Sequence, residues 1–308
     1  MSSTPQTPAP TPAPVPRHLA WARRGRAVRR LWSEFRRSTP GMVGLVTLLL
    51  ACVGALLAPL FISPAELSLT RAPGPFVASP SWTYPLGTDS FGRSIMHLIW
   101  EGARVSLTVG FLATFISVFL GTLVGITAGH FRGWVESVLM RFTDWVLVLP
   151  TLVLAISLVV VMGRGLSTII IAIGVTAWPV TARLVRAQTL AVESRPYIER
   201  AKALGGGHWH VMSRHVLPNV MPIVLARTTL LVAGTIIAES TLAFLGLGDS
   251  SRISWGSTLQ EARSAGATSA GLWWWILPPG FAIALVALAF TLVGRALEQV
   301  LNPRLSER

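Results

Sequence analysis

The sequence predicts an all-α integral membrane protein with six transmembrane helices, and three observations support this fold class. The first is composition: 52% of the 308 residues are hydrophobic, 13% are charged, and the mean hydropathy is +0.59. A soluble domain usually carries about 25% charged residues, so much of this surface does not face water. The second is a series of apolar segments, each near the roughly 20 residues that cross the hydrocarbon layer. The third is that basic residues concentrate on one side of these segments.

Two segments precede the first apolar run. Residues 1–16 are mostly Pro, Thr, Ser and Ala without periodicity, which predicts a disordered tail. Residues 17–40 are rich in arginine, interleaved with Leu31, Trp32 and Phe35. This pattern predicts a basic amphipathic segment that lies on the cytoplasmic face of the membrane.

The predicted transmembrane domain covers residues 41–300 and is followed by a short cytoplasmic tail at 301–308. Its spans are expected at 41–62, 104–129, 138–162, 166–186, 217–240 and 276–298. Its long connections are the outer loops 63–103 and 241–275 and the inner loop 187–216. Three tryptophans, Trp273 to Trp275, precede the last span and are expected in the outer interfacial belt.

The distribution of arginine sets the expected orientation. Eight arginines lie within the first 37 residues, directly before the first span. Such a flank marks the cytoplasmic side of a membrane helix, so both termini are expected in the cytoplasm after six crossings. The net charge of +13 could also indicate nucleic-acid binding, but no zinc-ligand spacing or stacking-aromatic motif supports that class.

Small residues recur within the second predicted span. Gly121, Gly125 and Gly129 fall four residues apart and therefore share one helix face. Such a stripe lets two helix backbones approach closely, so we expect it to pack against a neighbouring helix.

The inner loop carries an amphipathic pattern. Ser194 and Pro196 are expected to start a short helix, and Gly205 to Gly207 to end it. A second short helical stretch is expected over 208–216, ending before Leu217 and Pro218. The apolar face of the first helix is expected to contain Tyr197, Ile198, Ala201 and Leu204, and its charged face Glu193, Glu199, Arg200 and Lys202. The pattern alone fits a helix on the lipid headgroups or one inserted into a groove of a partner protein.

This loop resembles the EAA loop of ABC importer permeases. The resemblance rests on Glu199, Ala201, Gly205, Leu217 and Pro218, with Arg200 where the family usually has Ala. It implies that the first short helix is a coupling helix, which docks into a cleft of a cytoplasmic ATPase. It also implies that the glycine permits the turn between the two short helices.

Further stretches resemble the second permease of bacterial dipeptide and oligopeptide importers, from about residue 38 to 305. They are PLGTDSFGRS at 85–94, FRGWVESVLMRFTDWVLVLPTLVLAI at 131–156, ESTLAFLGLG at 239–248, SWG at 254–256, WWWILPPGFAIAL at 273–285 and LNPRL at 301–305. Ser94 replaces the usual Asp, and Ser250, Ser251 and Arg252 stand in place of the usual Pro pair.

The resemblance implies a type I importer fold in the bacterial inner membrane. It implies four kinds of partner: a second permease subunit, one or two ABC ATPase subunits, an extracytoplasmic peptide-binding protein and the peptide. It implies no cofactor in this chain, because the ATPase subunits bind ATP and Mg²⁺. The chain itself lacks the Walker lysine motif.

Charged residues inside predicted spans are candidates for the substrate path, because burying them in lipid is costly. Arg141 and Asp144 lie three residues apart and are expected to pair, either as an interfacial anchor or as a gate near the inner mouth. Arg227 lies near the middle of the fifth span, where it either lines the path or bonds to a neighbouring helix. Glu239 at the outer end is expected to meet water or a neighbouring helix.

Two rival functions stay open. The same architecture could import another cargo, such as a nickel chelate or an opine. A membrane-embedded hydrolase would need a convergent cluster of catalytic groups, and Asp144 is the only aspartate in the predicted spans. The histidines are interpreted as polar loop groups rather than metal ligands: His97, His130, His208, His210 and His215.

Overall fold

The computed structural model describes residue 29 and residues 31–301. The predicted tail 1–16, most of the basic segment and the last seven residues lie outside the described residues. The elements are α2 (Thr39–Phe61), α3 (Ile95–His130), α4 (Trp134–Val148), α5 (Thr151–Met162), α6 (Leu166–Glu193), α7 (Pro196–Ala203), α8 (His208–Val211), η1 (Met212–Val216), α9 (Leu217–Leu242), η2 (Ala243–Leu247), α10 (Trp255–Ser264) and α11 (Trp273–Leu301).

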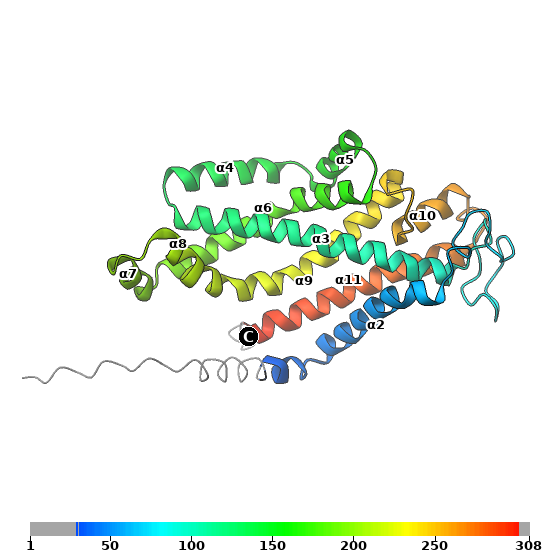
Figure 1. Cartoon of the computed structure of the whole chain (residues 1–308), viewed down its shortest axis with the longest axis horizontal. Helices are drawn as coiled ribbons and strands as arrows, with labels where there is room; N and C mark the ends of the chain where they lie inside the picture. The colour runs from blue at the N-terminus through cyan, green and yellow to red at the C-terminus, as the bar shows by residue number, and fades with distance from the viewer. Residues whose placement is uncertain (1–28, 30, 302–308) are drawn as a thin grey trace, which may run out of the picture.

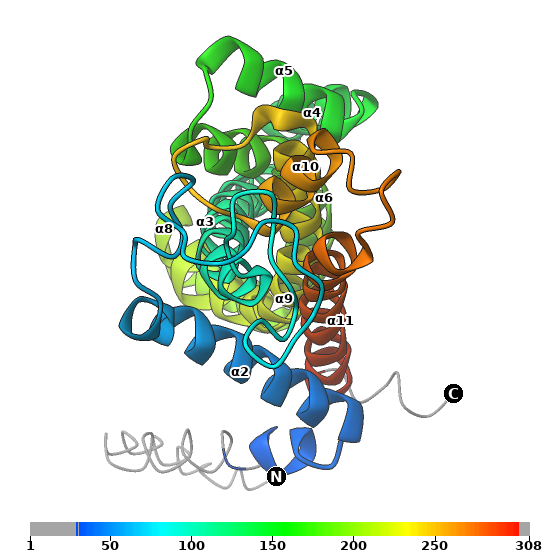
Figure 2. The ribbon, with the colours of Figure 1, turned by 90° about the vertical axis from the view of Figure 1, so that its right-hand side faces the viewer.

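The long helices lie side by side along the longest axis of the molecule (Figure 1). Helices α7 and α8 lie at one end of this bundle, and α10 and the segment between α2 and α3 lie at the other. Viewed from the α10 end, α2 and α11 form one side, α4 and α5 the opposite side, and α3, α6 and α9 fill the middle (Figure 2). We call the α7 end the inner end and the α10 end the outer end.

Five helices within the described residues are long and apolar enough to cross a membrane: α2, α3, α6, α11 and the continuous helix His208–Leu247. A sixth span exists if α4 and α5 count as one, although they are bent by 88°. The prediction of one unbroken helix over 138–162 is therefore wrong. Leu149 is extended, with φ −77° and ψ 131°, as expected for a residue before proline, and Pro150 has no N–H to continue the helix.

The glycine stripe packs α3 against α6, as predicted. A Cβ atom at Gly121 would lie 2.6 Å from the Cβ atom of Thr181, and one at Gly125 would lie 2.6 Å from the carbonyl oxygen of Ala182. A Cβ atom at Gly129 would lie 2.6 Å from that of Thr189. Real side chains do not approach so closely, so the axial distance between α3 and α6 depends on these glycines.

The tryptophans at the start of α11 do not all lie on the surface. Trp273 is exposed, whereas Trp275 is buried and packs with Ile95, Leu98 and Ala262. The prediction of a three-tryptophan belt is therefore wrong for Trp275, because α11 begins at Trp273 and its turns direct neighbouring side chains to different sides.

Candidate functional site

The inner end carries a hairpin of two short helical arms, which we call the coupling hairpin and define as residues 196–216. Its first arm, α7, begins at Pro196, where proline's missing N–H costs no helical hydrogen bond. Ser194 does not start this helix, contrary to the prediction. It ends α6, and its hydroxyl donates to the carbonyl oxygen of Ala191 over 3.1 Å.

The apolar residues of α7 are not all buried. Ile198 is fully buried and packs with Val192 and Val211. Tyr197 is 42% exposed and Leu204 is 89% exposed. The expected apolar face is therefore not buried as one surface: Ile198 points into the bundle, whereas Tyr197, about 100° away on the helix, and Leu204, the C-cap residue, are exposed. The arm is anchored through Ile198 and presents apolar side chains outward.

Gly205 closes the turn between the two arms. Its φ of +84° lies in the left-handed region that favours glycine. The N–H of Gly206 donates to the carbonyl oxygen of Ala201 over 2.9 Å, and the N–H of Gly205 donates to that of Lys202 over 3.0 Å. This pair of bonds is a Schellman motif, which satisfies carbonyls at the end of α7.

The second arm does not end before Leu217, contrary to the prediction. Helix α8, the π-helical segment η1 and α9 form one continuous helix. Pro218 lies in the first turn of α9, and the side chain of Asn219 donates to the carbonyl oxygen of His215 over 2.6 Å. The wider π turn accommodates the prolyl ring without a break. The second arm is therefore a direct extension of the transmembrane helix α9.

A half-buried polar cluster lies beneath the hairpin, and sequence reasoning missed it. The carboxylate of Glu193 at the end of α6 accepts from the Lys202 Nζ over 2.5 Å and lies 2.6 Å from the His130 Nδ1. The His130 Nε2 lies 2.9 Å from the His208 Nδ1. We call these four residues the inner cluster. Glu193 is 7% exposed, so it does not lie on the solvent-facing side of the loop as expected.

The histidines of the inner cluster bond to one another and to Glu193 rather than surrounding a vacant centre. Among the described residues, no group of three or more His, Cys, Asp and Glu side chains is arranged to hold a metal ion. No sequence spacing reveals the cluster, because His130 and Glu193 are 63 residues apart.

The charges expected to line the path are arranged differently from the prediction. Asp144 does not pair with Arg141: it pairs with Arg183 of α6 over 2.6 Å. Glu136 forms a second ion pair between α4 and α6, with Arg186. The guanidinium of Arg183 reaches from α6 to α4, whereas Arg141 is exposed and has no ion pair within the described part of the chain.

Arg227 and Glu239 lie on different sides of α9. Arg227 is exposed, and within the described residues it makes no hydrogen bond to a neighbouring helix. Glu239 is 2% exposed, and Ser106 of α3 donates to its carboxyl group over 2.9 Å. Of the two expectations for Glu239, contact with a neighbouring helix is therefore confirmed.

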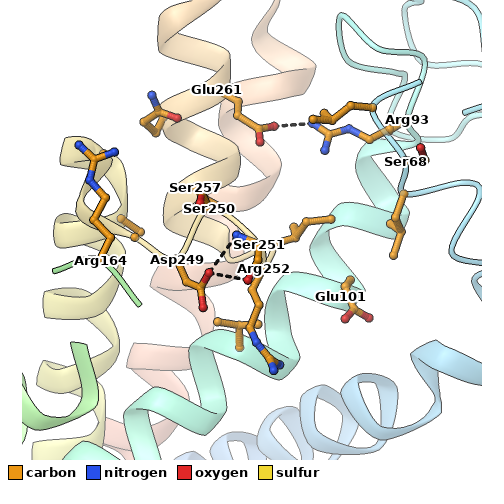
Figure 3. Close-up of a pocket in the computed structure, with 18 of the residues that line it drawn as sticks. Ser68, Arg93, Glu101, Arg164, Asp249, Ser250, Ser251, Arg252, Ser257 and Glu261 are labelled. Atoms are coloured by element: carbon orange, nitrogen blue, oxygen red, sulfur yellow. Dashed lines mark hydrogen bonds and ion pairs between the residues drawn. The ribbon is translucent and has the colours of Figure 1, made fainter. Parts of the chain in front are cut away.

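The outer end contains a polar cleft of about 740 Å³ (Figure 3). Its charged lining residues are Arg93, Glu101, Arg164, Asp249, Arg252 and Glu261. The Ser251 hydroxyl donates to the Asp249 carboxylate over 2.6 Å and holds the pKa of that carboxyl below its usual value. The segment that replaces the family's usual proline pair therefore forms its own hydrogen-bonded turn at the mouth of the cleft.

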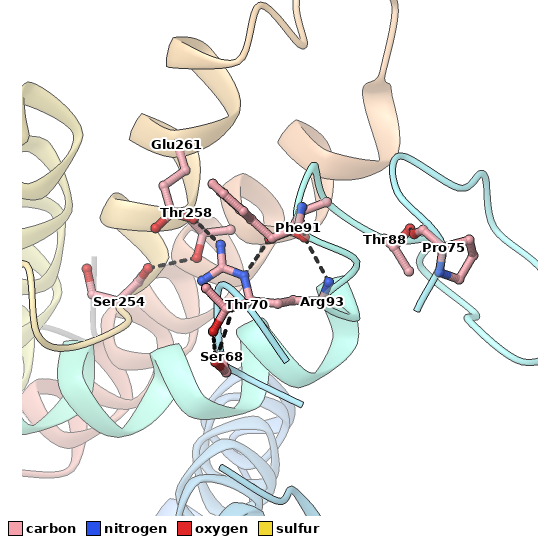
Figure 4. A network of polar contacts seen from close by, with 10 residues as sticks. Ser68, Thr70, Pro75, Thr88, Phe91, Arg93, Ser254, Thr258 and Glu261 are labelled. Atoms are coloured by element: carbon pink, nitrogen blue, oxygen red, sulfur yellow. Dashed lines mark hydrogen bonds and ion pairs between the residues drawn. The ribbon is translucent and has the colours of Figure 1, made fainter. Parts of the chain in front are cut away.

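Arg93 connects the outer segments to α10 (Figure 4). It is 2% exposed, its Nε donates to Asp89 over 2.6 Å, and its guanidinium also pairs with Glu261. Burial raises the pKa of Glu261, and the charge of Arg93 offsets part of that effect. The motif at 85–94 thus folds around the internal Asp89–Arg93 ion pair, and the Arg93–Glu261 pair holds α10 near the start of α3.

Comparison with known protein families decides the class of this chain. A family model described as the binding-protein-dependent transport system inner membrane component matches residues 121–307. The chain belongs to this family. A second model, described as the N-terminal TM domain of oligopeptide transport permease C, matches residues 27–73.

Several curated relatives of this permease are similar over most of its length. The dipeptide transport system permease protein DppC of Bacillus subtilis is 36% identical over 278 residues, which cover 89% of this chain and 85% of the relative. A putative peptide transport system permease protein of Brucella suis is 37% identical over 264 residues, covering 85% and 87%. The glutathione transport system permease protein GsiD of Pectobacterium atrosepticum is 33% identical over 288 residues, covering 92% and 94%.

Family membership confirms the predicted class. The chain is a multi-pass inner membrane permease of the type I importer fold, and it is a transport component rather than an enzyme. The rival of a membrane-embedded hydrolase is thereby excluded. Within this permease fold, the motif at 85–94 shapes the outer end. The glycine stripe packs α3 against α6.

Proposed function

We propose that this permease is one of the two membrane subunits of an ATP-driven importer of di- and oligopeptides. The printed names of its relatives, which refer to dipeptide, peptide and glutathione transport, support the peptide cargo. In this assignment, a second permease completes the translocation path, an extracytoplasmic binding protein delivers the peptide, and separate ATPase subunits bind ATP and Mg²⁺.

We further propose that the coupling hairpin is the ATPase docking element, and one observation carries this assignment. The hairpin projects from the inner end with exposed apolar side chains, yet its second arm is continuous with α9. An exposed apolar tip beside Glu199 and Arg200 suits a groove on a partner protein. A displacement of the second arm moves α9 directly, because α8, η1 and α9 form one continuous helix.

This assignment places both termini in the cytoplasm. The arginine-rich start of the chain lies before α2, and a basic flank favours the cytoplasmic side. The end of α11 and the hairpin lie toward the same end of the bundle (Figure 1). The outer cleft then faces the binding protein.

Purification of the complex in mild detergent, followed by uptake in proteoliposomes, tests the proposal. We expect a sister permease and an ATPase to co-purify and labelled dipeptides to accumulate only with ATP and the binding protein. A complex that lacks an ATPase would contradict the coupling assignment. ATP-dependent uptake that dipeptides do not compete for, but a nickel chelate or an opine does, would contradict the cargo.

A further inference from the structure

The inner cluster joins four helices through the Glu193 carboxylate and the His130 ring. Glu193 ends α6, Lys202 belongs to α7, His208 belongs to α8 and His130 ends α3. The contacts measure 2.5 Å from Lys202 to Glu193, 2.6 Å from His130 to Glu193 and 2.9 Å from His130 to His208. The side chains of His130 and Glu193 are 1% and 4% exposed.

Burial makes these contacts mutually dependent. A buried carboxylate is unfavourable unless charged or hydrogen-bonding partners compensate for its lost hydration. Here Lys202 and His130 supply that compensation from two different helices. Because a carboxylate accepts, the His130 Nδ1 carries a proton, and its Nε2 is left to share one proton with His208. Moving the hairpin away therefore removes Lys202 from the carboxylate and His208 from His130.

The cluster also connects α3 to the coupling hairpin, which the backbone does not do directly. Helix α6 leads into α7 through two residues, and α8 leads into α9 without a break. Helix α3 has no such continuity with the hairpin. Among the described residues, the His130–His208 contact is the one hydrogen bond that joins α3 to the coupling hairpin. The ring of His130 also packs edge-on against Phe131, with centroids 4.9 Å apart, which fixes its orientation.

We propose that the inner cluster is a latch that makes the inner end of α3 follow the coupling hairpin during transport, with His130, Glu193 and His208 acting as positioning residues. This inference rests on the proposed function of the hairpin. An apolar cluster that includes Ile198 and Val211 of the hairpin and Ile126 of α3 holds the hairpin to the bundle. The latch adds a directional polar contact, which sets how movement of the hairpin reaches the inner end of α3. Without the latch, ATP hydrolysis moves the hairpin and α9, but the inner end of α3 does not move with them.

The test uses the assembled complex in proteoliposomes and measures peptide transported per ATP hydrolysed. The variants are His208→Gln, Glu193→Gln and His130→Asn. The matched control is His210→Gln, two residues along the same arm and outside the latch. We expect the three variants to lower the ratio by at least about five-fold, the lower end of common coupling energies, while the ATPase stays bound. His208 is exposed, so its variant does not disturb the buried bundle.

Three outcomes distinguish a failure of the latch from a failure of the proposed transport function. An unchanged ratio in His208→Gln and Glu193→Gln, with the ATPase bound, overturns the latch and leaves the coupling assignment intact. Loss of the ATPase from His208→Gln also overturns it, because His208 would then belong to the docking surface. Absence of an ATPase from the unaltered complex overturns the proposed function and the latch together.

Discussion

The Asp144 carboxylate of α4 accepts two hydrogen bonds from the Arg183 guanidinium of α6, at 2.6 and 3.1 Å. Both side chains are more than half exposed. Together with the pair formed by Glu136 and Arg186, this contact holds α4 alongside α6. Among the described residues, these two ion pairs are the polar side-chain contacts that join α4 to another helix.

Neutralising Asp144 is expected to loosen α4. Asp144→Asn and Arg183→Gln should each lower stability by about 0.2–1 kcal/mol, the range for exposed ion pairs. A double-mutant cycle on the purified protein in detergent, read by thermal unfolding, measures their interaction. Arg141→Gln is the control and should have no coupling to Asp144. Coupling of Asp144 to Arg141 instead of Arg183 would contradict the observed pairing.

Substitution of a glycine of α3 is expected to destabilise the protein far more than substitution of a glycine with open space around it. Gly125→Ala should destabilise the bundle by about 1–3 kcal/mol, because its Cβ atom would overlap α6. Gly234→Ala on α9 meets nothing within 4 Å and should be neutral or stabilising. Melting temperatures in detergent compare the two, and equal effects would refute the close α3–α6 contact.

The turn of the coupling hairpin is expected to need glycine at position 205 but not at position 207. Gly205→Val places a β-branched residue at φ +84°, which costs about 1–2 kcal/mol locally and distorts the tip. Gly207→Val is the control, since its φ is −65° and its surroundings are open. We expect Gly205→Val to lose ATP-dependent uptake without a change in bundle melting temperature, and Gly207→Val to retain uptake. Equal uptake in both variants would contradict the role of the turn.

Arg227 is expected to act on the cargo if it lines the path. Arg227→Gln should reduce uptake of acidic peptides by about ten-fold, which corresponds to loss of one charge-assisted hydrogen bond, and should reduce uptake of neutral peptides less. Arg227→Lys keeps the charge and should retain most uptake. Unchanged uptake of both peptide classes in Arg227→Gln would show that the side chain lies outside the path.

Hydropathy and spacing predicted most of the fold, because long apolar runs have few alternatives in a membrane. The glycine stripe was predictable for the same reason: its period matches one helix face. The break at Leu149 and Pro150 was not predicted, although a proline preceded by an apolar residue allows either a kink or a full break. Sequence alone does not distinguish the two.

The details of the candidate site were less predictable. Motif resemblance pointed to the loop that is proposed to couple to the ATPase, and the left-handed Gly205 agrees with the expected turn. The partner of Asp144 could not be predicted from local spacing, because Arg183 is 39 residues away. The inner cluster depends on how the ends of α3 and α6 meet the hairpin, which is a tertiary property with no local signal.

Site-specific cross-linking from Leu204 tests the central claim most directly. A cysteine at position 204, in a Cys52→Ala background, is treated in native membranes with a short bifunctional reagent. The control cysteine replaces Phe76, which is 75% exposed and lies in the segment between α2 and α3 at the outer end. We predict an adduct with the ATPase from position 204 and none from position 76. An ATPase adduct from position 76, or none from position 204 in a transporting complex, would contradict both the orientation and the coupling role of the hairpin.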